Sequence, residues 1–448
     1  MKKVLIPIFH GHIARNILRT AVLSELTKQA EVILVVPAFK RDLYEKEFGG
    51  KLVKVIASPE IKHSDLDKFL RIFYYYFVDT ATVRTIQQEQ FILTNKYPRY
   101  LWVRFWTKLF GNIKILRQFI RLLDRLLVKD VTFTNIFDTH KPDIVFIPSI
   151  TSDDEGLVLR QAKARGIKSV GMVRSWDNIT VNKGNIRIFP DKLLVHTNIL
   201  KEDCVKYADY PGERIEVVGM SHFDYYVTDT RIPREEFFKK IGGDPKKKTI
   251  YFMPIGLSDI EEDKFMLNFL ETLVRSDKNF TNTQLMLSLH PNATKPIDYA
   301  SKDTLFIKPP QSIDFPSGKP TDREITKEAM ELMASAIYHS DLVVNYQGTT
   351  SIDASAFDKP VINIAFDGSK ERPYLKSVRR FYDFTHYQPI LETKGVKLAR
   401  SIEKLKAQII EYLNHPELDR AGRKRIVEEQ APQHDGHASE RTALALLN

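Results

Sequence analysis

The loop from Gln347 to Thr350 carries the small, amide and hydroxyl side chains that commonly surround a bound phosphate. It follows the apolar run Leu342 to Asn345, which predicts a buried parallel strand, and precedes a helical pattern from Ser351 to Phe357. Because the start of a helix attracts anions, we expect the loop to meet phosphate oxygens, with Asp353 placed to bind a ribose diol. The alternative is an ordinary strand-to-helix connection. The polar residues of the loop are Gln347, Gly348, Thr349 and Thr350.

Strand patterns alternate with helical patterns in both halves of the chain, which predicts α/β architecture with two doubly wound parallel sheets. Ligands of such sheets lie at the carboxyl ends of the strands, so we expect the loop from Phe9 to His12 to point into a cleft. Helices are predicted at about 397–414, 416–430 and 438–447. The apolar strand patterns lie at 4–9, 32–36, 52–57, 143–149, 168–173, 193–196, 214–219, 248–253, 284–289, 304–307, 342–345 and 361–364.

The length of 448 residues favours two domains over one. We predict a first Rossmann-like domain at 1–225, with a helical insertion at about 64–139 where the strand alternation stops. The second Rossmann-like domain is predicted at 226–430. The last segment, 431–448, is predicted to form a helix that packs back toward the first domain.

The composition is that of a soluble globular protein, with 43% hydrophobic and 28% charged residues. The only cysteine, Cys204, excludes an internal disulfide and a cysteine-based zinc site, and the chain enters a strand pattern at once without a signal-peptide pattern. We therefore expect a cytoplasmic location. The net charge of +10 indicates an anionic partner, which composition does not identify.

The segment from Arg99 to Lys129 is basic, aromatic and helical in pattern, and Asp124 is its only acid. Such a helix is typical of a protein that lies on an anionic membrane surface. The alternative is a helical insertion that packs its apolar face on the domain and leaves its arginines in solvent. RNA is a further partner that a basic surface suits, but no RNA-binding motif lies beside it. The predicted basic stripes are Arg104 with Lys108, and Arg117 with Arg121, Arg125 and Lys129, beside Trp102, Phe105, Trp106, Phe119, Leu122, Leu123 and Leu126.

The run from Gly348 to Ile362, GTTSIDASAFDKPVI, resembles the donor-binding signature of the GT-B glycosyltransferases, which have two Rossmann-like domains facing a central cleft. The resemblance implies that Gly348, Thr349 and Thr350 meet a diphosphate and that Asp353 meets the ribose, although Glu is more frequent at that position. Three further motifs resemble the branch containing CDP-glycerol glycerophosphotransferases and bacterial surface-polysaccharide glycosyltransferases. They are VVGMSHFD at 217–224, LSLHPN at 287–292 and DGHASER at 435–441. In that branch the His-Pro loop lies beside the donor phosphates, which makes His290 a candidate donor ligand, together with Gly256 and Gln347.

The segment PIFHGHIAR at 7–15 resembles the acceptor loop of inverting GT-B enzymes, in which a histidine deprotonates the acceptor hydroxyl. His12 matches that position and needs a carboxylate partner, for which Asp153, Asp154 and Asp177 are candidates. The alternative is that the histidines simply end a strand and cap a helix. Predicted acceptor-binding residues are His10, Gly11, Trp176 and Asn178.

No acidic pair is predicted to bind a metal. Asp65-Leu66-Asp67 has the spelling of a metal-binding motif, but it precedes a helical pattern and is interpreted as a helix cap. Cations are expected to neutralise the leaving diphosphate instead. The candidates are Lys308, Arg372 and Arg379.

The resemblance implies a metal-independent glycosyltransferase that moves a sugar from a UDP- or CDP-linked donor to a hydroxyl of a cell-envelope glycan or lipid-linked acceptor. No bound cofactor is expected. The enzyme alternatives are a phosphotransferase that uses a CDP-linked polyol and a UDP-sugar 2-epimerase. The alternative of another class is a non-catalytic scaffold that binds membrane or RNA through its basic helices.

Overall fold

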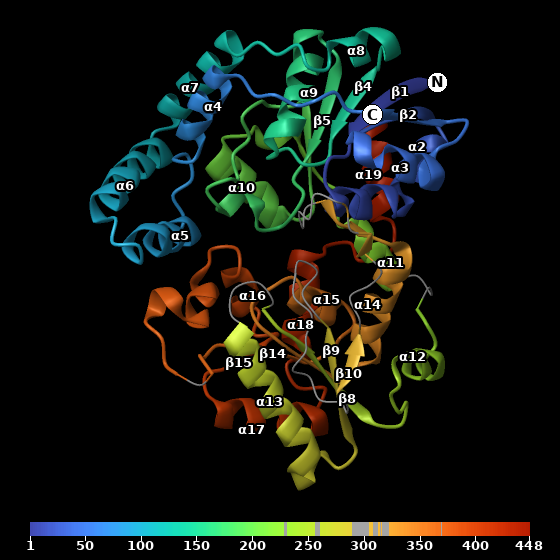
Figure 1. Ribbon diagram of the computed structural model, residues 1–448, viewed down its shortest axis with the longest axis vertical. Helices are drawn as coiled ribbons and strands as arrows, with labels where there is room; N and C mark the ends of the chain where they lie inside the picture. Colours follow the sequence, from blue (N-terminus) through green and yellow to red (C-terminus); the bar gives the residue numbers. More distant parts are fainter. Residues whose placement is uncertain are drawn as a thin grey trace. The chain divides into compact units, whose positions relative to one another are not determined.

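The computed structural model describes residues 1–227, 231–255, 260–288, 304–307, 312–313, 315, 322–368 and 370–448 (Figure 1). The chain divides into two compact units. Unit 1 comprises Met1–Asp224 and Asp435–Asn448, and unit 2 comprises Tyr225–His434. Each unit is built on a parallel sheet of its own.

The sheet of unit 1 has seven strands in the order β3-β2-β1-β4-β5-β6-β7, all paired in parallel. The order reverses between β1 and β4, which makes their carboxyl ends the topological switch point where ligands of such sheets bind. The strands are β1 (Lys2–Pro7), β2 (Ala30–Val36), β3 (Val53–Ala57), β4 (Ile144–Ile147), β5 (Lys168–Met172), β6 (Lys192–Val195) and β7 (Ile215–Val217).

Helices cover both faces of this sheet, because successive side chains of each strand point to opposite faces and both faces are apolar. Val4 and Ile6 of β1 join one core cluster with Leu26, while Leu5 joins the other with Phe137. Apart from α19 (Ala438–Leu447) and short 3-10 turns, the helices of this unit outside the insertion are α1 (Gly11–Ile13), a π-helix (Ala14–Leu18), α2 (Ala21–Thr27), α3 (Arg41–Phe48), α9 (Asp153–Ala164) and α10 (Asn198–Ala208), with α11 (Asp224–Val227) where the chain leaves the unit.

The predicted insertion between β3 and β4 is helical throughout. Its own small core contains Tyr74, Phe77, Phe110 and Ile120. Of the helices within the described residues, none is long and apolar enough to cross a bilayer. The helices of the insertion are α4 (Asp65–Tyr74), α5 (Ala81–Ile92), α6 (Tyr97–Asn112), α7 (Lys114–Leu127) and α8 (Thr134–His140).

The predicted basic stripes of this insertion are wrong for three of their arginines. Arg104 pairs with Asp79 at 3.0 Å, and Arg117 and Arg121 pair with Asp209 at 2.6 and 2.8 Å. Arg104 therefore holds the insertion together, and Arg117 and Arg121 hold it to the end of α10, instead of lying in solvent. The sequence pattern missed this because Asp209 lies about ninety residues away from its partners.

The last helix, α19 (Ala438–Leu447), belongs to unit 1 and packs against α2. Leu446 is fully buried in the core cluster that contains β1. The Asp224 carboxylate accepts hydrogen bonds from the backbone N–H groups of Ala438 and Ser439 at 3.0 and 2.8 Å. This carboxylate therefore satisfies two donors at the start of the helix that would otherwise lack partners.

The main sheet of unit 2 has the strand order β10-β9-β8-β13-β14-β15, again parallel, and its switch point lies between β8 and β13. Its strands are β8 (Lys248–Met253), β9 (Thr283–Ser288), β10 (Leu305–Ile307), β13 (Leu342–Asn345), β14 (Val361–Ile364) and β15 (Lys397–Ala399), and β11 (Ser312–Ile313) pairs separately with β12 (Glu324–Ile325). The helices are α12 (Arg234–Ile241), α13 (Ile260–Ser276), α14 (Lys327–His339), α15 (Thr350–Ala356), α16 (Gln388–Glu392), α17 (Ile402–Asn414) and α18 (Arg420–Gln430).

The prediction of a helix that begins near Lys397 is wrong. Residues Lys397–Ala399 form β15, which pairs with β14 at the edge of the sheet, and the helix begins only at Ile402. A strand of three residues is too short to show a periodicity of its own, and the strong helical pattern that follows it obscured it.

Candidate functional site

The acceptor loop predicted from the sequence lies at the switch point of unit 1. His10 comes three residues after β1 ends at Pro7 and occupies the position before α1, Gly11 is buried, and His12 is half-buried in the same short turn. The π-helix at Ala14–Leu18 comes next, a rare geometry that is often found near functional sites. The catalytic role of His12 stays a prediction.

The three acids at the start of α9 lie at the carboxyl end of β4, the other strand of this switch point, and each has a partner. Asp153 pairs with Arg71 at 2.8 Å and with Arg187 at 3.2 Å. The Asp154 carboxylate pairs with His63 at 2.8 Å. Glu155 is fully buried and accepts a hydrogen bond from the Ser149 N–H, and its burial raises the pKa of the carboxyl well above the ordinary value.

His63 lies between two carboxylates and was not predicted. Its Nε2 is 2.8 Å from Asp154, and its Nδ1 is 2.9 Å from Asp67. The hydrogen bonds to Asp154 and Asp67 raise the pKa of His63 to about 9, against the opposing effect of burial. His63 is therefore an imidazolium at neutral pH, which makes it a proton donor and not a base. The charge of His10 also contributes to the lowered pKa of Asp154, so the loops after β1, β3 and β4 meet here.

Asp67, which the sequence suggested as a helix cap, is part of this charged network. Ser64 caps α4 by accepting a hydrogen bond from the Asp67 N–H. The Asp67 carboxylate is buried and pairs with His63 and with Arg187, the latter at 2.8 Å. Arg187 also pairs with the buried Asp124 at 2.9 Å. The cap prediction was therefore wrong for Asp67, because its side chain pairs with His63 and with the distant Arg187 and does not cap the helix.

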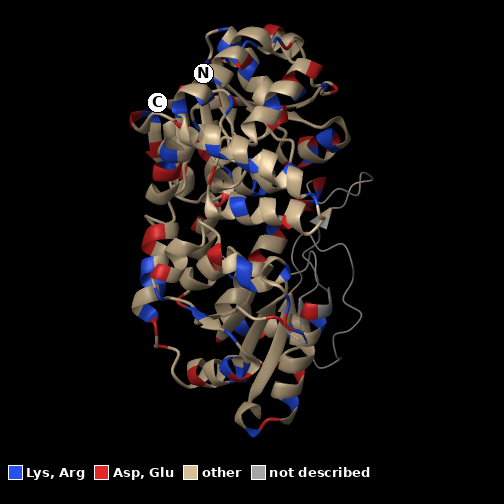
Figure 2. Ribbon diagram, turned by 90° about the vertical axis from the view of Figure 1, so that its left-hand side faces the viewer, with Lys and Arg blue, Asp and Glu red and all other residues tan. Residues whose placement is uncertain are grey.

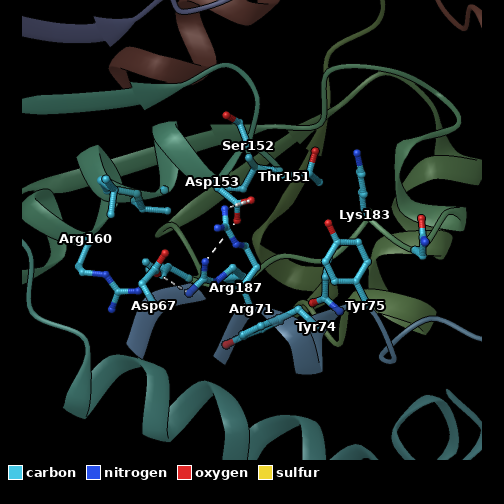
Figure 3. Close-up of a pocket in the computed structure, with 17 residues that line it drawn as sticks. Asp67, Arg71, Tyr74, Tyr75, Thr151, Ser152, Asp153, Arg160, Lys183 and Arg187 are labelled. Carbon is cyan, nitrogen blue, oxygen red and sulfur yellow. Dashed lines mark hydrogen bonds and ion pairs between the residues drawn. The ribbon is translucent and has the colours of Figure 1, made fainter. Parts of the chain in front are cut away.

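A pocket opens beside this network, entirely within unit 1 (Figure 3). Its volume of about 130 Å³ is below the roughly 300–1,000 Å³ of sites that hold a drug-sized ligand, so it has room for one small polar group. Figure 3 shows Lys183 and Tyr75 on the side of the pocket away from Asp67. The side chains that bear charge, a hydroxyl or an amide there are Asp67, Arg71, Tyr74, Tyr75, Thr151, Ser152, Asp153, Arg160, Asn182, Lys183, Asn185 and Arg187.

The charges around the pocket are nearly balanced. His63, Arg71, Arg160 and Arg187 are paired with Asp67, Asp124, Asp153 and Asp154. Within the part of the chain that the structure describes, Lys183 has no ion pair and is exposed. The pocket therefore offers one unpaired positive charge among neutralised groups. A carboxylate held by cations has a lowered pKa and is a weak base, as is the case for Asp154.

The remaining acceptor candidates follow β5. Asp177 accepts hydrogen bonds from the hydroxyl of Ser175 at 2.5 Å and from the amide of Asn178 at 3.3 Å. Trp176 is 7% exposed, which leaves little of its ring to meet a ligand and favours the interpretation as a core residue. The catalytic role of Asp177 and the acceptor-binding role of Asn178 stay predictions.

In unit 2, the loop from Gln347 to Thr350 follows β13 at the switch point, as its sequence position requires. Ser351 N–H donates to the Gly348 carbonyl, and Asp353 N–H donates to the Thr349 carbonyl. The backbone N–H groups of Ser351 and Asp353 are thus engaged within the turn. Thr349 is exposed there, and a Cβ placed on Gly348 would meet no atom within 4 Å.

A buried network of hydrogen-bonded side chains connects the end of β13, the first turn of α15 and β14, and so fixes both ends of this loop. Asn363 donates to Asn345 at 2.7 Å, and the Tyr387 hydroxyl donates to Asn363 at 2.6 Å and lies 2.9 Å from the Ser351 hydroxyl. Fully satisfied networks of this kind hold one backbone geometry. The amide of Gln347 contacts the ring of His386 at 3.2 Å, which orients the first side chain of the loop.

The other predicted donor contacts have different outcomes. The carboxylate of Asp353 accepts a hydrogen bond from the hydroxyl of Tyr226 at 3.0 Å, so a ribose would share or displace that contact. Arg372 pairs with Glu262 at 2.8 Å and Arg379 with Glu371 at 3.4 Å, so neither predicted cation is reserved for a diphosphate. Gly256, His290 and Lys308 lie outside the described residues. Within the described ranges, no three His, Cys, Asp or Glu side chains are grouped as a metal site.

No family model and no curated protein matches the chain. Solved structures do match it over nearly its whole length. A UDP-GlcNAc 2-epimerase from Methanocaldococcus jannaschii has 13% identity and a TM-score of 0.54, with 100% of this chain and 99% of that chain covered. A UDP-GlcNAc 2-epimerase from Neisseria meningitidis, bound to UDP-GlcNAc, has 14% identity and a TM-score of 0.52, with 99% of each chain covered. A glycosyltransferase from Rickettsia africae has 12% identity and a TM-score of 0.51, with 100% and 99% covered.

At such low identity the likeness establishes the fold. The two parallel sheets, the helices on their faces and the coverage of both units agree with these structures. The resemblance to the CDP-glycerol branch stays a prediction. The protein has the GT-B fold that the sequence predicted, with two Rossmann-like units in one chain.

Proposed function

We propose that the protein is an enzyme of nucleotide-sugar chemistry that transfers a sugar from a nucleotide-linked donor to an acceptor hydroxyl. The observation that carries the proposal is the position of the candidate loops. The loop Gln347–Thr350 follows β13 at the switch point of unit 2, and the loops with His10 and Asp153 follow β1 and β4 at the switch point of unit 1. Ligands of open α/β sheets bind at such points. The fold shared with UDP-GlcNAc 2-epimerases and a glycosyltransferase supports the same proposal.

The donor is assigned to unit 2. Its diphosphate would meet the exposed residue Thr349 and the open space at Gly348, and its ribose would reach Asp353 after displacing Tyr226. The nucleotide is UDP or CDP. The acceptor is assigned to unit 1, where the pocket beside Lys183 has room for one small polar group. His12 is proposed as the base that deprotonates the acceptor hydroxyl.

A thermal-shift panel of UDP, CDP, GDP and their sugars tests donor binding. A ligand that binds only the folded protein stabilises it by about 2.7 kcal/mol at a hundred times its Kd. Gly348→Glu places a carboxylate where no protein atom interferes, so it should abolish the shift by repelling phosphate while leaving the unliganded melting temperature unchanged. Gly50→Glu is the matched control, because Gly50 lies in equally open space in unit 1. If nucleotide still raises the melting temperature of the Gly348→Glu variant, this loop is not part of the donor site.

A second candidate, 2-epimerisation of a UDP-sugar, is favoured by the epimerases among the similar structures. Removal and return of the proton on sugar carbon 2 would leave deuterium there in D₂O, whereas transfer releases UDP and leaves that hydrogen in place. Mass spectrometry of the sugar product separates the two reactions without knowledge of the acceptor.

For sugar transfer, His12→Ala should remove turnover and retain the nucleotide-induced thermal shift; unchanged turnover would exclude His12 as the base.

A further inference from the structure

The helices α4, α6 and α7 expose an unusual number of large apolar side chains. Most of the exposed large apolar residues of the described chain lie between residues 66 and 131. On α7 they form a stripe at helical spacing, Ile115, Phe119, Leu122 and Leu126, with exposures between 43% and 71%. On α6, Trp102 and Phe105 are 59% and 58% exposed.

These side chains are not the core of the insertion. That core uses other residues of the same helices, among them Phe110 on α6 and Ile120 on α7. Each helix therefore has one apolar face that is buried and a second that is exposed. We call the exposed set, Leu101, Trp102, Phe105, Ile115, Phe119, Leu122 and Leu126, the apolar face of the insertion. Exposed apolar surface on this scale usually marks an interaction site.

The exposed charges on the two helices that carry the apolar face, α6 and α7, have one sign. The only acid between residues 97 and 129 is Asp124, which is 1% exposed and paired with Arg160 and Arg187. The exposed charged residues from 96 to 129 are Lys96, Arg99, Lys108, Lys114, Arg125 and Lys129. In the described part of the chain, Lys108, Lys114, Arg125 and Lys129 have no ion pair.

The two helices that carry this face pack against each other. Helix α7 packs against α4 and α6, and all three lie outside the strands of unit 1 (Figure 1). On the side that faces the viewer in Figure 2, the helices of unit 1 are mostly tan, with blue and some red segments. Apolar residues that include a tryptophan, on two helices whose exposed charges are all cationic, match the boundary between acyl chains and anionic headgroups.

We propose that the apolar face of the insertion docks on an anionic lipid bilayer, with its aromatic and aliphatic side chains inserted below the headgroups and its lysines and Arg125 at their level. A second copy of the chain fits less well, because a two-fold interface would oppose this cationic surface to itself. The proposal is independent of the donor site and needs no nucleotide.

Flotation of the full chain with lipid vesicles tests the proposal. The protein should bind vesicles of phosphatidylcholine mixed with phosphatidylglycerol, and bind vesicles of phosphatidylcholine alone at least about tenfold more weakly. Binding should fall as salt rises from about 0.1 M to about 1 M, over which the Debye length shrinks from about 10 to about 3 Å. The fluorescence of the exposed Trp102 should shift to the blue on binding.

Two sets of variants distinguish insertion from attraction by net charge. Trp102→Ser with Phe105→Ser and Phe119→Ser removes exposed apolar groups, and should lower binding at least about tenfold without affecting the melting temperature. The triple variant Lys108→Glu, Lys114→Glu, Lys129→Glu should also lower vesicle binding at least about tenfold. The matched control is the triple variant Lys46→Glu, Lys51→Glu, Lys54→Glu, which makes an equal change of net charge elsewhere on unit 1.

The proposal is overturned if the two charge-reversal sets weaken binding equally, or if the serine variant binds anionic vesicles like the parent. It is also overturned if the parent chain forms a dimer and does not bind vesicles, while the serine variant is a monomer. Retained nucleotide shifts in all these variants would show that only the membrane surface has been changed.

Discussion

His63 illustrates how single residues acquire their chemistry from distant neighbours. Asp67 is four residues away on α4, but Asp154 comes from the start of α9, so only the fold brings the second carboxylate to the ring. The same is true of Arg187, which joins Asp67, Asp124 and Asp153. These groups hold the insertion against the switch point of the sheet. Removing one partner would leave a buried charge without compensation, which is why such networks stabilise a single arrangement.

The His63 network predicts a pH-dependent stability. The pKa of His63 in the folded protein is raised from 6.5 to about 9, so its stabilising contribution is complete below pH 6.5 and is lost as the pH rises through about 9. His63→Ala should therefore lower the free energy of unfolding by about 1–3 kcal/mol near pH 6 and by much less near pH 10. Urea unfolding at both pH values measures the difference.

The control for this experiment is His415→Ala, because His415 is exposed and pairs only with the exposed Glu417. Its effect should stay within about 0.5 kcal/mol at both pH values. A His63→Ala destabilisation of equal size near pH 6 and pH 10 would show that the histidine contributes through packing and not through its charge.

At the scale of elements, the position of α15 depends on close backbone contacts that only glycine allows. Helix α18 packs against α15, which follows the proposed donor loop. A Cβ on Gly422 of α18 would lie 2.5 Å from the backbone N of Gly395 and 2.6 Å from the backbone of Lys394. The buried Arg423 next to it pairs with Asp358 just after α15 at 2.9 Å. A displacement of α18 would therefore reach the donor loop.

We expect Gly422→Ala to destabilise unit 2 by about 1–3 kcal/mol, because the clash is with backbone atoms that cannot rotate away. Amide hydrogen exchange of peptides from unit 2 should show the loss of protection, strongest in α15 and α18. Gly156→Ala, within α9 where the new methyl meets no atom within 4 Å, should instead be neutral or stabilise by up to about 1 kcal/mol. Unchanged exchange in Gly422→Ala would contradict this account.

At the scale of the whole molecule, the end of the chain completes unit 1. Residues Asp435–Asn448 return to a unit that the chain left at Asp224. The apolar side chains of α19 enter the core cluster of β1 and α2, and Lys2 donates a hydrogen bond to the carbonyl of Leu447 at 2.7 Å. The first and last residues of the sequence therefore depend on each other for stability.

Leu446→Ala should lower the stability of unit 1 by about 2–5 kcal/mol, since Leu446 is fully buried and its removal leaves a cavity. Leu444→Ala, two residues earlier on the same helix and 42% exposed, should cost less than about 0.5 kcal/mol. All three tryptophans, at 102, 106 and 176, belong to unit 1, so urea unfolding followed by tryptophan fluorescence reports on this unit. Equal effects of the two substitutions would mean that α19 is not part of the cooperative core.

Local patterns determined much of the fold. Apolar runs such as Leu342–Asn345, ended by glycine, proline or polar turns, specify parallel strands because a strand covered on both faces needs apolar side chains at every position. The predicted doubly wound sheets and the helical insertion followed from such patterns, whereas the GT-B fold was implied by the resemblance of residues Gly348 to Ile362 to a donor-binding signature; all three are confirmed. Patterns failed at β15, where three residues are too few to show a period, and the edge position that makes them a strand is set by β14.

The sequence by itself also selected the loops at the switch points, because the ends of strands are local features. Only the tertiary structure decided what each charged residue in them does. Sequence patterns place a charged residue either in solvent or in a site. The structure instead pairs Asp153 with Arg71 and Arg187, which lie far from it in the chain. It likewise pairs Arg117 and Arg121 with the distant Asp209. Ion pairs form between side chains that the fold brings within about 4 Å, and nothing in the spacing of residues along the chain encodes which pairs these are.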